Sequence, residues 1–304
     1  MILMSKRILV AACAAATALA LSACSPSAST GDKTSKASKD GTLTVMASFY
    51  PLKYLTEKVG GEHVTVTSLT PDGAEPHDLE LSPKMVDSLA SADAVVYLAG
   101  FQGAVDEAIE QHAPTTVIDV SSAAQLVAID STSNHPGEDE GTDEAQSGEA
   151  QSGKAQSGEA ADHDHEGHEH EGHDHEHADH DHHHDMSMDP HFWLDPARMA
   201  NAATLVGDKL AEADPTNAET YKANAQALNK ELTSLGDNLV TKTSTCQIKT
   251  FVTAHTAFGY LADRTGLTQV GISGLDPESS PSPARLAEIG KIVKDQGVTT
   301  IFTE

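Results

Sequence analysis

A chain of 304 residues with 38% hydrophobic residues is long enough for two ordinary domains with buried cores. Its formal net charge of −27 argues against nucleic acid as a partner, because the phosphates would repel the protein. Most of this charge is local, since residues 135–190 hold 18 acidic side chains and a single lysine.

The N-terminus has the features of a secretory signal peptide, which we assign to residues 1–23. Two basic residues precede an apolar run over residues 8–20 that is too short to span a bilayer. The Leu-Ser-Ala-Cys motif that follows predicts a lipoprotein in which Cys24 carries the acyl chains, palmitate among them. Residues 24–41 would then form a tether on the extracytoplasmic face of the cell membrane. The alternative is an ordinary cleaved signal peptide.

Residues 42–215 are expected to form an N-terminal α/β lobe, because strand and helix patterns alternate there as in a parallel sheet covered on both faces. Pro83 is predicted to open a helix that Ser82 caps. The sequence predicts strands at 43–47, 64–69, 94–98 and 116–120, and helices at 51–59, 83–90 and 105–111.

Residues 131–188 interrupt this lobe with a segment that cannot bury a core, and we expect this insert to be disordered. Residues 163–184, called the histidine tract below, alternate histidine with acidic residues and glycine. Imidazole is the commonest zinc ligand, so the tract predicts a metal-binding loop of low affinity; the alternative is a merely solvating acidic loop. Its histidines are His163, His165, His168, His170, His173, His175, His177, His180, His182, His183 and His184.

Two helices are predicted after the insert. Asp195 caps the first, with a proline at its first position. Thr216 and Glu219 have the spacing of a capping box for the second, a linking helix over residues 216–243. Its apolar face is predicted to comprise Tyr221, Ala225, Leu228, Leu232, Leu235 and Leu239.

Residues 244–304 are expected to form a C-terminal α/β lobe. The predicted strands are 248–254, 269–272 and 299–302, and the predicted helices are 258–264 and 283–294. Such a sheet is only half covered, and we therefore expect that this lobe is truncated in the sequence.

Three histidines outside the tract stand where α/β proteins place ligands. His77 lies in a loop after the second predicted strand and His255 directly follows the strand that begins the C-terminal lobe. His191 lies in a segment bounded by prolines that holds the only tryptophan. A lone histidine is more often structural, but three such positions in one chain indicate a metal site.

The segments around these histidines resemble the metal-binding lipoproteins of zinc- and manganese-specific ABC importers. The similarity extends over residues 43–304 with its motifs in family order. The motifs are 73–78 (GAEPHD), 92–97 (ADAVVY), 189–196 (DPHFWLDP), 253–261 (TAHTAFGYL), 271–275 (GISGL) and 281–283 (PSP).

This resemblance implies two βα lobes with parallel sheets, joined by one long helix, with a metal cleft between the lobes. It also implies that His77, His191 and His255 are ligands and that the partners are an ABC permease and its ATPase. The His-rich insert resembles the zinc branch of the family, and manganese members usually carry a carboxylate at the position of His255. Imidazole suits zinc, so Zn²⁺ is the expected cargo and Mn²⁺ the less favoured one.

The chain departs from the family pattern at several points. The family's fourth ligand is an acidic residue in a segment that this sequence lacks, so Glu75 or a water would complete the site. Ser280 stands where the family commonly has glutamate. The resemblance also implies that Cys246 could pair with a cysteine of that same segment, as in some relatives.

Two other classes of function remain open from the sequence. Three histidines with an open fourth position also suit a zinc-dependent hydrolase, but we find no HExxH pairing, and Glu75 is the only nearby candidate base. A surface protein that buffers metal or mediates cell adhesion without transport is the other alternative. We predict that the protein is not an enzyme.

Overall fold

The computed structural model describes residues 41–130, 134 and 187–303, all within one compact unit. The predicted signal peptide, Cys24 and the histidine tract lie outside the described residues. Among the described helices, none is both long and apolar enough to cross a membrane.

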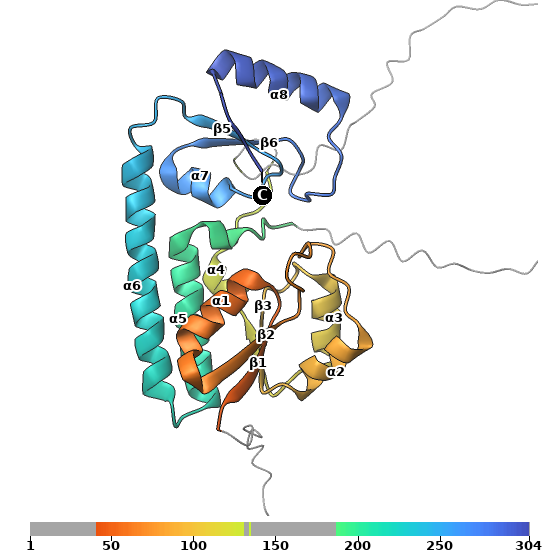
Figure 1. The fold of residues 1–304 in the computed structure, drawn as a ribbon, viewed down its shortest axis with the longest axis vertical. Helices are drawn as coiled ribbons and strands as arrows, with labels where there is room; N and C mark the ends of the chain where they lie inside the picture. Colours follow the sequence, from red (N-terminus) through yellow and green to blue (C-terminus); the bar gives the residue numbers. More distant parts are fainter. Residues whose placement is uncertain (1–40, 131–133, 135–186, 304) are drawn as a thin grey trace, which may run out of the picture. The chain divides into compact units, whose positions relative to one another are not determined.

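A four-stranded parallel sheet forms the N-terminal lobe, as predicted. The strands β1 (Leu43–Ala47), β2 (Val64–Ser68), β3 (Ala94–Tyr97) and β4 (Thr116–Asp119) lie in the order β2-β1-β3-β4. Helices α1 (Tyr50–Gly60) and α5 (Pro196–Ala213) cover one face, and α2 (Pro83–Ser91) and α3 (Gly103–His112) cover the other (Figure 1).

The alternation of side chains along each strand fills two cores, one on each face of this sheet. On β1, Leu43, Val45 and Ala47 pack in the larger core with residues of α1, α5 and α6. Met46 points the other way and packs with Val95 and residues of α2 and α3 in the smaller core. The buried sheet therefore holds the carboxyl ends of β1 and β2 in fixed positions.

Two of the predicted helix caps are confirmed. The Ser82 hydroxyl accepts a hydrogen bond from the Met85 N–H at the start of α2. The Asp195 carboxylate accepts one from the Ala197 N–H at the start of α5, at 2.9 Å.

The predicted capping box of the linking helix is wrong. Helix α6 spans Ala218–Thr243, and its N-cap residue, Asn217, makes no capping hydrogen bond with its side chain. The Asp214 carboxylate organises this turn instead. It accepts hydrogen bonds from the Thr216 N–H, the Asn217 amide and the Tyr221 hydroxyl, the last at 2.9 Å.

Helix α6 has 26 residues, and packs mainly along α5 and α1. Its predicted apolar face is correct as far as Leu232, but Leu235 is 48% exposed and Gly236 is buried in its place. A Cβ at Gly236 would lie 3.3 Å from the guanidinium of Arg264 and 3.7 Å from Pro196. The buried face of α6 therefore shifts by one residue where the helix meets the C-terminal lobe.

The C-terminal lobe contains a parallel sheet in the order β6-β5-β7, which confirms its predicted class. Its strands are β5 (Thr250–Thr253), β6 (Thr268–Gly271) and β7 (Ile301–Phe302), and its helices are α7 (Gly259–Thr265) and α8 (Pro283–Gln296). Three short elements were not predicted: α4 (Ser121–Ala124) and the 3₁₀ turns η1 (Gly61–His63) and η2 (Phe192–Leu194).

Residues at the edges of the predicted insert are held by hydrogen bonds. The Ile129 N–H donates to the Ser187 carbonyl at 3.1 Å and the Asp189 N–H donates to the Val127 carbonyl at 2.9 Å, so these two segments run antiparallel. We call residues 127–129 and 187–189 the base ribbon. The side chain of Asn134, also within the predicted insert, donates to the Asp263 carboxylate at 2.8 Å in the C-terminal lobe.

Candidate metal centre

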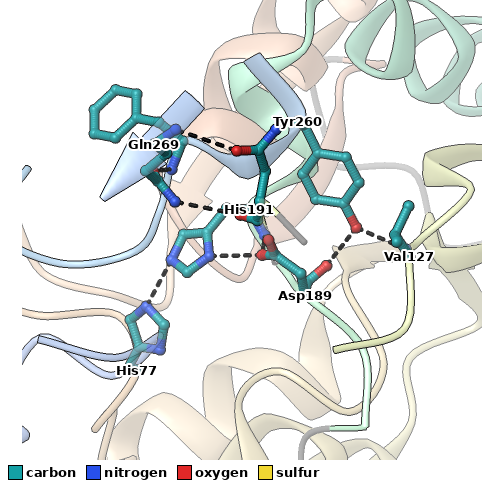
Figure 2. A network of polar contacts seen from close by, with 8 residues as sticks. His77, Val127, Asp189, His191, Tyr260 and Gln269 are labelled. Carbon is teal, nitrogen blue, oxygen red and sulfur yellow. Dashed lines mark hydrogen bonds and ion pairs between the residues drawn. The ribbon is translucent and has the colours of Figure 1, made fainter. Parts of the chain in front are cut away.

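His77, His191 and His255 meet at one point, as expected from their positions in the sequence. Each offers one ring nitrogen, and these atoms lie within 4.8 Å of one another. The Nε2 atoms of His77 and His191 face each other at 3.2 Å (Figure 2). The His255 ring centroid lies 5.3 Å from that of His191 and 6.1 Å from that of His77.

These separations match the coordination chemistry of a small divalent ion. Two imidazole nitrogens on a tetrahedral zinc ion, each about 2.0–2.1 Å from the metal, stand about 3.3 Å apart. The two Nε2 atoms, 3.2 Å apart, are already at that distance. The third nitrogen, within 4.8 Å, needs only a small inward movement to complete a three-imidazole face.

A hydrogen-bonded chain from the sheet edge holds the loop of His77. The buried Gln102, at the start of α3, donates to the Thr70 hydroxyl at 3.0 Å and to the Pro76 carbonyl at 2.9 Å. Thr70 in turn donates to the Ser48 carbonyl at the end of β1. The position of the His77 backbone is therefore tied to the carboxyl ends of β1 and β2.

His191 is oriented by a buried carboxylate two residues earlier. Asp189 accepts a hydrogen bond from the His191 N–H at 2.9 Å and contacts its Nδ1 at 2.8 Å (Figure 2). Because an ionised carboxylate only accepts hydrogen bonds, the proton of the neutral imidazole belongs on Nδ1 and the lone pair on Nε2. Nε2 is the atom that faces His77.

The His255 loop is fixed by the polar groups beside it. The Thr253 hydroxyl donates to the His255 carbonyl at 2.6 Å, and the Thr256 hydroxyl donates to the Ser273 carbonyl at 3.0 Å. Gly271 permits this close approach, because a Cβ there would lie 2.1 Å from the Thr256 hydroxyl.

Phe49, Phe101 and Trp193 form an aromatic cluster that packs against His77 and His191. The His77 ring meets Phe101 edge-on at 4.9 Å between centroids, and the His191 ring lies 5.1 Å from Trp193. Phe49 packs against both Phe101 and Trp193. The only tryptophan of the chain is thus a direct neighbour of the site and a natural optical reporter for it.

The surroundings keep two of the imidazoles neutral. Burial, with the nearby His191 and His255, lowers the pKa of His77 to about 3. Burial, followed by His191, lowers the pKa of His255 to about 4. Neutral imidazoles retain their lone pairs, so the site is prepared for a cation at neutral pH.

Glu75, the remaining predicted ligand, is not part of this group. Its exposed carboxylate accepts a hydrogen bond from the His77 N–H at 3.1 Å. The Glu-Pro-His segment at 75–77 and the Asp-Pro-His segment at 189–191 thus have the same local geometry. In each, the carboxylate accepts a hydrogen bond from the backbone N–H of the histidine two residues later. Only Asp189 also reaches the imidazole; the Nδ1 of His77 is buried without a hydrogen-bond partner among the described residues.

Sequence reasoning missed Asp189 and Tyr260 as parts of the site. The Tyr260 hydroxyl donates to the Asp189 carbonyl at 2.7 Å and accepts from the Val127 N–H at 2.8 Å (Figure 2). Burial raises the pKa of Tyr260 to about 12, so the hydroxyl keeps the proton it donates. An acid two residues before the candidate ligand His191 was a usable local signal for Asp189, whereas nothing local in the sequence indicated Tyr260.

The fold and the site together define a two-lobed α/β protein with three imidazoles arranged to hold a divalent cation. The sequence profile of the zinc-uptake complex component A, ZnuA, described as periplasmic, matches residues 45–304. The chain therefore belongs to the ZnuA family.

Individual relatives agree with this assignment. The zinc-binding lipoprotein AdcA of Streptococcus pneumoniae (strain R6) is 33% identical over 268 residues, covering 87% of this chain and 46% of AdcA. The high-affinity zinc uptake system protein ZnuA of Bacillus subtilis is 31% identical over 293 residues, covering 95% of this chain and 78% of that protein. The chain thus spans about half the length of the streptococcal AdcA proteins it matches.

Solved structures share the fold. The laminin-binding protein Lmb of Streptococcus agalactiae, described as bifunctional with adhesin and metal-transporting activity, is similar with a TM-score of 0.64 and 28% identity, covering 86% of this chain and 79% of Lmb. Zn(II)-bound AdcA of Streptococcus pneumoniae has a TM-score of 0.61 and 28% identity, covering 87% of this chain and 46% of AdcA.

Proposed function

We propose that this protein captures Zn²⁺ outside the cytoplasmic membrane and delivers it to an ABC importer. The observation that carries the proposal is the convergence of His77, His191 and His255, with two Nε2 atoms already at the spacing of a tetrahedral zinc shell. Three imidazole nitrogen donors favour zinc over manganese, which prefers carboxylates and water. The fourth ligand is a water or an acidic group.

Membership of the ZnuA family supports an ABC importer as the partner. The relatives carry names of zinc binding and zinc uptake, and a captured ion needs a permease and its ATPase to cross the membrane. We further propose that the histidine tract, which lies outside the described residues, supplies weak, rapidly exchanging ligands that gather zinc. Metal would pass from the tract to the better-organised site.

A catalytic role is not part of this proposal. Glu75 is the candidate general base for a hydrolase, but its carboxylate is exposed and accepts a hydrogen bond from the His77 backbone N–H. Adhesion stays a separate hypothesis, prompted by the description of Lmb. Hydrolysis of ester or peptide substrates by the zinc-loaded protein would support the first alternative, and normal zinc uptake without the protein would support the second.

A bacterium that lacks this protein should grow poorly when zinc is scarce. We expect the native chain to restore growth and ⁶⁵Zn accumulation in chelator-treated medium, and a chain with alanine at His77, His191 and His255 to fail. Excess zinc should remove the difference, because other routes then suffice. Full rescue by the triple variant would contradict the role of the site in uptake.

The anchor is tested by one substitution at a residue outside the described part of the chain. We expect Cys24→Ser to shift the protein from the membrane fraction to the medium or periplasm, because Cys24 is the residue that the Leu-Ser-Ala-Cys motif predicts to carry the acyl chains. Cys246→Ser is the matched control and should stay in the membrane. Membrane retention of Cys24→Ser, measured by fractionation and immunoblotting, would refute the lipid anchor.

A further inference from the structure

The segment that carries His191 is held at both ends by one helix of the other lobe. Its first end is Asp189, in the base ribbon, and its second end is Asp195, the cap of α5. Tyr260 of α7 binds the first end, and Arg264, one helical turn later, binds the second. Residues four apart lie on the same face of a helix, so both contacts come from one side of α7.

The contact at Asp189 is buried and uses both hydrogen-bonding capacities of the tyrosine. Tyr260 is 1% exposed, and its hydroxyl joins the two segments of the base ribbon by accepting from Val127 and donating to Asp189. The guanidinium of Arg198 lies 4.3 Å from the centre of the Tyr260 ring and donates to the Ala124 carbonyl at 2.8 Å. Helix α5 therefore packs on the tyrosine from the N-terminal lobe.

The contact at Asp195 is an ion pair across the lobes. The Arg264 Nε donates to the Asp195 carboxylate, which also caps α5 and lies 3.5 Å from the Arg198 Nε. Charge-assisted hydrogen bonds of this kind hold geometry more firmly than neutral ones. The stretch from Asp189 to Asp195 is thus fixed to the C-terminal lobe at two points six residues apart.

We infer that Tyr260 and Arg264 are positioning residues for the metal: by holding Asp189 and Asp195, they set where the Nε2 of His191 lies relative to His77 and His255. Neither side chain is proposed to touch the ion. The consequence is that the docking of α7 onto the His191 segment and the retention of zinc are one linked event. This inference rests on the proposed function, since it concerns the same site.

Tyr260→Phe tests the inference with the loss of a single oxygen atom. Outer-shell partners of metal ligands typically contribute about 10–100-fold to affinity. Tyr260 acts one step further out, through the backbone of Asp189, so we expect zinc to bind about tenfold more weakly, at the lower end of that range. The loss should come from faster dissociation, measured in competition titrations with a fluorescent chelator. The visible absorption bands of the Co²⁺-substituted protein should also change, because the His191 imidazole takes a different pose. Arg264→Lys should act in the same direction.

Tyr221→Phe is the matched control. Tyr221 is also fully buried, and its hydroxyl donates to the Asp214 carboxylate in the turn between α5 and α6. It contacts the ring of His63, which is not part of the three-histidine site. Both variants should lose thermal stability, but Tyr221→Phe should keep the native zinc affinity and Co²⁺ spectrum. Arg264→Lys carries the test if Tyr260→Phe does not fold.

The outcomes distinguish the positioning role of α7 from the proposed capture of zinc. Native affinity and spectrum in both α7 variants would overturn the positioning role while leaving zinc capture intact. Equal weakening by Tyr221→Phe and Tyr260→Phe would also overturn it, because the effect would then be one of general stability. A native protein without tight zinc binding would overturn the proposed function, and the inference with it.

Discussion

Replacing His191 with alanine should lower the affinity for zinc by more than the roughly 100-fold that outer-shell partners contribute, because it removes a ligand rather than a support for one. His191 is 1% exposed, and its ring centroid lies 5.1 Å from that of His77 and 5.3 Å from that of His255. Alanine also leaves the buried Asp189 carboxylate without the imidazole that it contacts at 2.8 Å. We therefore expect His191→Ala to be more damaging than His77→Ala or His255→Ala.

Trp193 provides the measurement, because its ring lies 5.1 Å from that of His191. Zinc titrations followed by tryptophan emission should saturate at one equivalent in a chain that lacks residues 135–186. His112→Ala, at the exposed end of α3, is the matched control and should titrate like the native chain. Unchanged affinity in all three ligand variants would refute the site.

The fold could be predicted because its signals are local. The strands of the N-terminal lobe are short segments rich in valine, isoleucine and threonine that alternate with helical patterns, and the structure has them within one or two residues of the predicted positions. The predictions are wrong where a contact between residues in different elements determines the local structure. Asp214 replaces the predicted capping box of Thr216, and Gly236 replaces Leu235 where α6 meets Arg264.

The candidate site was predictable in part. His77 and His255 follow strands, so the rule that ligands gather at the carboxyl ends of parallel strands places them together. Asp189 was within reach of local reasoning, because an aspartate often accepts from the N–H two residues on. Tyr260 was not, because its partners Val127 and Asp189 lie 133 and 71 residues away and meet it only through the packing of the lobes.

Acid should empty the histidine tract before it empties the three-histidine site. Exposed imidazoles with the ordinary pKa of about 6.5 are protonated about 30 to 1 at pH 5, and each loses that factor in metal affinity. His77 and His255, with pKa values lowered to about 3 and about 4, stay largely neutral at pH 5. At pH 5, proton competition would lower the metal affinity of two exposed imidazoles by about 1000-fold in total, whereas it hardly lowers that of His77 and His255.

The same lowered pKa values destabilise the metal-free protein at acidic pH. Below pH 6.5 the unfolded chain takes up protons that the folded His77 and His255 do not bind, so folding stability falls as the pH drops from 6.5 towards 4. Thermal unfolding of the metal-free chain, measured across this range, should show that fall. Replacing both histidines with asparagine should flatten it, because asparagine does not titrate.

Metal analysis of the zinc-loaded protein, dialysed at successively lower pH, distinguishes the two populations of ions. The full chain should release several ions near pH 6–6.5 and retain one until the pH falls below about 5. The chain lacking residues 135–186 should show only the second step. Loss of the last ion together with the others would mean that the buried imidazoles titrate like exposed ones. A shortened chain that binds no zinc at pH 7.5, while still folded, would mean that the tract supplies part of the primary site.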